Sequence, residues 1–176
     1  LALAFDMTRA APDAAIRYAN FLLRDGRSVA ARNVLTDARA ANPGNVDVMT
    51  SLARILLTKG AWVEAQNIAN TRRAIDTPTA QEAATGLQAA LLLGQNKIED
   101  SLAFLQGEID QGNADVTAVS QVVQIHLQAG NVDTARSYLD QALVDFPGDP
   151  TLQMLTASLF AMAGAFAQAE THFRDM

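Results

Sequence analysis

The sequence predicts an all-α fold, a solenoid of antiparallel helix pairs, on the basis of three observations. Apolar residues recur three or four positions apart along most of the chain, which is the spacing of one face of an α-helix. No segment alternates apolar and polar residues convincingly over the length of a strand. Five glycines recur at intervals of 34, 34, 36 and 34 residues: Gly26, Gly60, Gly94, Gly130 and Gly164. A nearly fixed period of this length indicates a repeat protein in which each unit is a pair of helices.

The ends of the predicted helices are marked by turn-forming and capping residues. A glycine can take the left-handed conformation that ends the first helix of each pair. Proline interrupts helical hydrogen bonding, so Pro12, Pro147 and Pro150 mark junctions between pairs. Thr79 and Glu82 have the spacing of a capping box at the start of the fifth helix. The expected helices are near 13–25, 28–41, 46–59, 62–75, 80–93, 97–111, 115–129, 132–145, 150–163 and 166–175.

Small residues follow the glycines at a constant distance and indicate where two helices approach closely. They stand five positions after the glycine in four pairs: Ala31, Ala65, Ala135 and Ala169. The third pair departs from the pattern. Two extra residues follow Gly94, Ser101 takes the place of the alanine, and Gly86 replaces a large apolar residue. We therefore expect this pair to pack less well or to bend the array.

The repeat resembles the tetratricopeptide repeat over about residues 12–176. Asn-Pro-Gly-Asn at 42–45 and Phe-Pro-Gly-Asp at 146–149 are similar to the turn between repeats of that family. Gly-Ala-Trp-Val-Glu-Ala at 60–65 and Gly-Asn-Val-Asp-Thr-Ala at 130–135 are similar to the turn within a repeat. The resemblance implies a right-handed superhelix whose first helices line a concave groove, and a protein that binds partner proteins or peptides there.

The repeat boundaries predict one solenoid over 1–176. Residues 1–11 are expected to be the tail of a preceding repeat, with Leu1 and Ala4 on its packing stripe. The repeats that follow are 12–45, 46–79, 80–115, 116–149 and a truncated 150–176. Because both ends fall inside repeats, we expect a segment of a larger bacterial protein.

Composition excludes several classes of protein. The 49% hydrophobic content is too high for a disordered chain, and the absence of cysteine excludes disulfide scaffolds and thiolate metal sites. No apolar run reaches the roughly 20 residues of a membrane-spanning helix. The net charge of −6 argues against nucleic-acid binding, although residues 1–75 carry ten basic and six acidic side chains and residues 76–176 carry three and thirteen.

No residue pattern predicts catalysis, a cofactor or a metal site. His126 and His172 lie 46 residues apart without further metal ligands at suitable spacing. His126 falls on a packing stripe, and Trp62, the only tryptophan, is expected to be a packing residue, with a ligand platform as its alternative. The acidic residues near helix ends are interpreted as capping or solvated groups: Asp110, Asp115, Asp145 and Asp149. The prediction is a non-enzymatic chain.

By resemblance, certain positions of each first helix face the concave groove and form the candidate peptide-binding site: Arg17, Asn20, Arg24, Arg54, Gln88, Gln121, Gln124 and Gln128. The three arginines lie at the start of this groove, and the glutamines continue along it. Arginine binds carboxylates through two parallel hydrogen bonds, and amide side chains can pair with a peptide backbone. We therefore expect a partner with an acidic or carboxyl-terminal segment near the first two repeats. An ordinary solvated face is the alternative interpretation of these residues.

The family's clamp for carboxyl-terminal chaperone tails is not expected here. Only Asn20 matches its pattern, and the other places hold unsuitable residues: Ile16, Ser51, Gln81 and Thr85.

Two other roles stay open at this point. One is a self-associating structural segment, because the last repeat is unusually apolar through Phe160, Met162, Phe166 and Phe173. The other is a substrate-recruiting module of a larger enzyme. A role in bacterial envelope assembly or export rests on analogy with the family, and the cytoplasm and periplasm remain equal alternatives.

Overall fold

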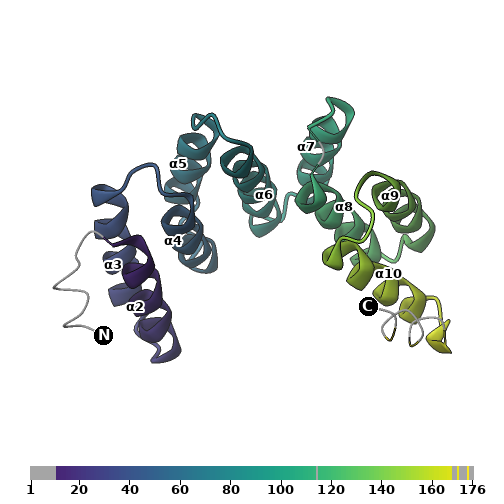
Figure 1. Ribbon diagram of the computed structural model, residues 1–176, viewed down its shortest axis with the longest axis horizontal. Coiled ribbons are helices and arrows are strands. Elements are labelled where there is room, and N and C mark those ends of the chain that lie inside the picture. Colours follow the sequence, from purple (N-terminus) through teal and green to yellow (C-terminus); the bar gives the residue numbers. More distant parts are fainter. Residues whose placement is uncertain (1–10, 114, 168–169, 171–173, 175–176) are drawn as a thin grey trace. The chain divides into compact units, whose positions relative to one another are not determined.

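The computed structural model describes residues 11–113, 115–167, 170 and 174, and every element it assigns there is an α-helix (Figure 1). The helices are α2 (Pro12–Arg24), α3 (Ser28–Ala41), α4 (Val46–Thr58), α5 (Trp62–Arg73), α6 (Pro78–Gly94), α7 (Ile98–Asp110), α8 (Val116–Gln128), α9 (Val132–Asp145) and α10 (Pro150–Met162). The predicted all-α class is confirmed, and the predicted helix boundaries agree to within a few residues for all helices up to 150–163; most of the predicted helix 166–175 lies outside the described residues. None of the described helices is both long and apolar enough to cross a membrane.

The helices form two compact units, residues 1–95 and residues 96–176. In unit 1, each helix from α2 to α6 packs on the next, and the first helices of successive pairs also meet, α2 with α4 and α4 with α6. In unit 2, α7 to α10 pack in the same sequential way and α8 also meets α10. Each unit therefore has one layer of first helices beside a layer of second helices. The assignment of 1–176 to one solenoid stays a prediction.

The core of each unit forms where the repeat places its small and apolar residues. Positions seven residues before the turn hold buried side chains in both units, as with Ala19, Ala53 and Val123. The small residues after the turn are fully buried as well, including Ala31 and Ala65. Helices can approach closely at such positions because little side-chain volume separates them. The prediction for Ala169, and those for Leu1, Ala4, His172 and Phe173, lie outside the described residues.

The turn of the third repeat differs from the prediction. Gly26, Gly60, Gly130 and Gly164 have positive φ angles, but in the third repeat the residue with positive φ is Asn96, at 61°. The prediction that Gly94 forms this turn was wrong, because α6 continues through Gly94 and the two extra residues lengthen this helix. Asparagine tolerates the left-handed conformation better than most residues. Ser101, five residues after Asn96, is fully buried in the place of the alanine.

The start of α6 also differs from the predicted capping box. The N-cap is Thr77, whose Oγ1 accepts a hydrogen bond from the backbone N–H of Ala80 at 3.3 Å. Pro78 follows as the first helical residue, where its missing N–H costs nothing. The capping role predicted for Thr79 therefore belongs to Thr77. The capping roles of Asp115 and Asp149 are confirmed, since each accepts hydrogen bonds at the N-terminus of its helix.

Replacing Asp115 with asparagine is expected to keep α8 capped and to make stability less dependent on pH. Asp115 Oδ1 accepts a hydrogen bond from the N–H of Ala118 at 2.6 Å. Burial raises the pKa of this carboxyl, although the backbone hydrogen bonds from Ala118 and Thr117 act in the opposite direction. Because the folded chain holds this proton more tightly than the unfolded chain, Asp115 lowers stability as pH rises from its ordinary pKa through the raised value. Asparagine does not titrate in this pH range, so the variant lacks this contribution to the pH dependence of stability.

Urea unfolding followed by circular dichroism at a series of pH values measures this difference. Asp115→Ala is the control for the cap, and relative to Asp115→Asn, which also has no titrating group there, it is expected to cost about 1 kcal/mol across the whole range. An Asp115→Asn variant with the same pH slope as the original chain would contradict the assignment of this titration to Asp115.

Candidate functional site

The predicted site residues of unit 1 lie on the first helices α2 and α4. Arg17, Asn20 and Arg24 are three and four residues apart on α2, so their side chains share one face of that helix. Arg54 stands on α4, and its Nη2 donates a hydrogen bond to Asn20 Oδ1 at 3.0 Å. The structure therefore brings Arg54 to the α2 face that carries the other two arginines. We call these four residues the arginine face.

The arginine face has cationic groups available for a ligand. Arg17, Arg24 and Arg54 are exposed, and Asn20 is half-buried. In the part of the chain that the structure describes, the side chains of Arg17 and Arg24 take part in no hydrogen bond or ion pair. Each guanidinium offers five N–H donors in a planar arrangement that fits a carboxylate. The face can bind anions, and a carboxylate of a peptide is the simplest of them.

Phe21 is a feature of this face that the sequence interpretation missed. It lies four residues after Arg17 and three before Arg24, and it is 47% exposed. Its ring stacks against Tyr18 with centroids 6.5 Å apart. The corresponding residues of later repeats, Ile55 and Ile125, are buried. The only sequence signal was the aromatic ring at a position where these repeats hold isoleucine.

Gln88 does not continue the arginine face in the way that the sequence predicted. It is half-buried on α6, and its Oε1 accepts a hydrogen bond from Gln66 Nε2 of α5 at 2.7 Å. Once Asn96 is taken as the turn residue, the position equivalent to Asn20 and Arg54 is Ala90. The extra length of α6 therefore changes which side chains follow the arginines.

The three remaining predicted site residues lie on α8 of unit 2. Gln124 and Gln128 are exposed, whereas Gln121 is half-buried and its Oε1 has no hydrogen-bond partner among the described residues. The three are spaced by three and four residues, which places them on one face of α8. They form a polar amide surface within unit 2.

Two aromatic residues that the sequence suggested as packing residues do pack. Trp62 is half-buried against the core of unit 1. His126 is half-buried and stacks on Tyr138 with ring centroids 5.8 Å apart. Among the described residues, no group of three His, Asp or Glu side chains is arranged to hold a metal ion.

Sequence comparison and structural comparison agree on the kind of repeat. Family models described as tetratricopeptide repeat match residues 22–91 and 123–176. None of the curated proteins matches the chain.

Solved structures with the same fold include several bacterial proteins. A thermophilic tetratricopeptide repeat protein of Thermus thermophilus is 20% identical, with 94% of this chain and 89% of that chain covered and a TM-score of 0.65. PilF of Pseudomonas aeruginosa is 18% identical, with 93% and 73% covered and a TM-score of 0.58. YrrB, described as having an unusual peptide-binding site, is 15% identical, with 97% and 87% covered and a TM-score of 0.50.

Proposed function

Because this chain belongs to the tetratricopeptide repeat family, we propose that it is a non-catalytic scaffold that binds an acidic segment of a partner protein on the arginine face. The observation that carries the proposal is the pair of exposed arginines, Arg17 and Arg24, that have no partner among the described residues and flank the exposed ring of Phe21. The peptide-binding site of YrrB supports the same class of function for this fold. A role in bacterial envelope assembly or export is a further part of this proposal and rests on the family resemblance.

The geometry of α2 suggests the form of the bound segment. Arg17 and Arg24 are seven residues apart, which corresponds to about 10 Å along a helix. An extended peptide covers this distance with about three residues. Two acidic side chains, or one acidic side chain and a terminal carboxylate, could therefore meet the two arginines while an apolar residue between them contacts Phe21. Arg54, held by Asn20, adds a third cation beside this stretch.

The triple variant Arg17→Glu, Arg24→Glu, Arg54→Glu is expected to bind such peptides at least ten-fold more weakly. Each exposed ion pair contributes up to about 1 kcal/mol, and charge reversal adds repulsion. Fluorescence anisotropy with labelled peptides that combine two acidic residues and one apolar residue, with free or amidated carboxyl ends, measures the change. Circular dichroism checks that the helical content is retained.

A matched control reverses three other exposed cations, Arg27→Glu, Lys97→Glu and Arg136→Glu. This control has the same net charge but an intact arginine face, so it should keep most of the affinity. Equal weakening in the two triple variants would show that binding follows net charge alone. Binding that neither variant changes would place the peptide elsewhere. Self-association through the C-terminal repeat, where Met162 and Phe166 are exposed, stays a separate prediction.

A further inference from the structure

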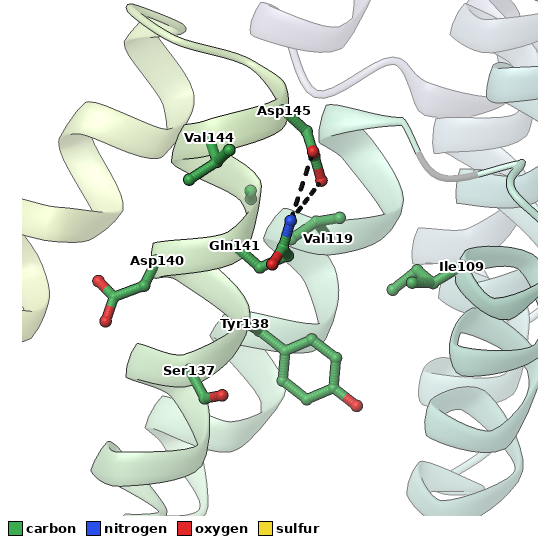
Figure 2. A pocket seen from close by; sticks show the side chains of 9 residues that line it. Ile109, Val119, Ser137, Tyr138, Asp140, Gln141, Val144 and Asp145 are labelled. Carbon is green, nitrogen blue, oxygen red and sulfur yellow. Dashed lines mark hydrogen bonds between the residues drawn. The ribbon is translucent and has the colours of Figure 1, made fainter.

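Unit 2 contains a cavity of about 600 Å³ between α7, α8 and α9. Ile109 of α7 and Val119 of α8 line it together with Tyr138 and Ala142 of α9. Figure 2 shows the ring of Tyr138 and the side chain of Ile109 on facing sides of the space. The volume lies within the range of about 300–1,000 Å³ that is typical of ligand sites. The cavity is large enough for a side chain with its neighbouring groups.

The polar groups of this cavity favour a cation. Asp140 and Asp145 contribute to its lining, and none of the described lining residues is positively charged. Gln141 Nε2 donates to the two carboxylate oxygens of Asp145 at 3.4 and 3.3 Å, which holds that carboxylate beside the cavity (Figure 2). The hydroxyl of Tyr138 accepts a hydrogen bond from Gln106 of α7, which orients the ring. Unit 2 as a whole carries eleven acidic and three basic side chains.

A comparison with unit 1 explains why unit 2 has room at this place. Helices α3, α4 and α5 begin at Ser28, Val46 and Trp62, and α7, α8 and α9 each begin 70 residues later. On this correspondence, Ile109 takes the position of Arg39, and Ala142 takes the position of Arg72. Two long cationic side chains of unit 1 are thus replaced by shorter apolar ones in unit 2.

Both arginines of unit 1 are held by hydrogen bonds, and the guanidinium group of Arg39 connects α3 with α5, the helices that correspond to α7 and α9. Arg39 Nη2 donates to Thr71 Oγ1 at 3.3 Å, and Thr71 is the counterpart of Gln141. Arg72 is only 2% exposed and donates to the carbonyl oxygens of Ala83 and Val46 at 2.9 and 3.2 Å. The helices of unit 1 that correspond to α7 and α9 therefore accommodate the guanidinium group of Arg39, whereas that of Arg72 reaches α4 and α6.

We propose that the cavity of unit 2 binds an arginine side chain of a basic partner segment. The guanidinium group lies beside Asp145, and the alkyl part of the side chain packs against Ile109 and Val119. Tyr138 is seven residues before Asp145, about 10 Å along α9, so its ring contacts an apolar neighbour of the bound arginine. This site selects the opposite charge from the arginine face, and it lies on other helices.

The probe is a labelled, capped Leu-Arg-Leu-Arg peptide, and its counterpart has citrulline in place of each arginine. Citrulline keeps the size of arginine but has no charge. Fluorescence anisotropy is expected to show binding of the arginine peptide and at least ten-fold weaker binding of the citrulline peptide. Asp145→Asn should weaken the arginine peptide at least five-fold. Asp133→Asn, which removes the same charge at an exposed position of α9 outside the cavity lining, should change binding less than two-fold.

Ile109→Arg tests the comparison between the units. It recreates the arginine of unit 1 and is expected to fill the cavity from within, so that peptide binding is lost while circular dichroism is unchanged. Equal affinity for the citrulline peptide, or equal effects of Asp145→Asn and Asp133→Asn, would overturn the proposal. The triple arginine-face variant is expected to bind this peptide with unchanged affinity. The proposals for the arginine face and for the cavity are therefore tested independently, and a negative result for one does not decide the other.

Discussion

Replacing Arg72 with alanine is expected to lower the free energy of unfolding of unit 1 by about 3 kcal/mol. The guanidinium group connects three helices, because Nη1 donates to the carbonyl of Ala83 in α6 and Nη2 donates to the carbonyl of Val46 and the hydroxyl of Thr50 in α4. Burial lowers the pKa of Arg72, and the nearby carboxylate of Asp47 opposes that shift. Arginine nevertheless stays charged at neutral pH. The alanine variant loses these hydrogen bonds and leaves a cavity in the packed interior.

Urea unfolding followed by tryptophan fluorescence measures this loss in unit 1, because Trp62 is the only tryptophan and lies there. Arg72→Met keeps most of the side-chain volume without the donors, so an intermediate loss is expected. Arg17→Ala removes an exposed arginine and should change stability by less than about 0.5 kcal/mol. A loss at Arg72 no larger than that at Arg17 would contradict a structural role for the buried guanidinium.

Replacing Gly94 with alanine is expected to destabilise the packing of α6 on α5 by about 1–3 kcal/mol. A Cβ atom at position 94 would lie 2.8 Å from two ring carbons of Trp62, Cη2 and Cζ3. This distance is shorter than a van der Waals contact, so the indole ring has to move out of its place against the core. The same movement should change the emission of Trp62, which gives a second measurement on the same variant.

Two controls separate the steric contact from a general effect of losing a glycine. Gly44→Ala places its Cβ in open space, with no atom of residues beyond its chain neighbours within 4 Å, and should leave stability nearly unchanged. In a Trp62→Leu background, Gly94→Ala should cost much less than in the original chain, as measured by urea unfolding and circular dichroism. The same cost in both backgrounds would show that the contact with Trp62 is not the cause.

The helical fold was predictable because its signals repeat along the chain. Glycine at a left-handed turn and small residues at close approaches recur with one period, so errors at single positions do not hide the pattern. The third repeat was misread because Gly94 and Asn96 lie two residues apart and both residue types tolerate the left-handed conformation. The repeat period favoured Gly94 as the turn residue. In the structure Gly94 lies within the helix, where the packing of Trp62 requires a residue without a side chain.

The candidate sites were less predictable than the fold. The period places Arg17, Arg24 and Arg54 on first helices, but the exposure of Phe21 and the hydrogen bond between Arg54 and Asn20 depend on neighbouring helices. The cavity of unit 2 had a signal that a single repeat cannot reveal. The signal is visible only when residues 70 positions apart in the two units are compared. Ile109 and Ala142 then occupy positions that hold arginine in unit 1. Whether a cavity forms depends on the combined volume of several side chains, which no single position reveals.

The packing of each helix on partners no more than two elements away along the chain has a kinetic consequence. Within either unit, every such contact closes only a short loop, so little chain entropy is lost before stabilising contacts form. Helical proteins with mainly local contacts refold in microseconds to milliseconds. Stopped-flow refolding of unit 1, followed through its single tryptophan, should therefore be largely complete within the mixing time, with no slow phase from the pairing of distant segments.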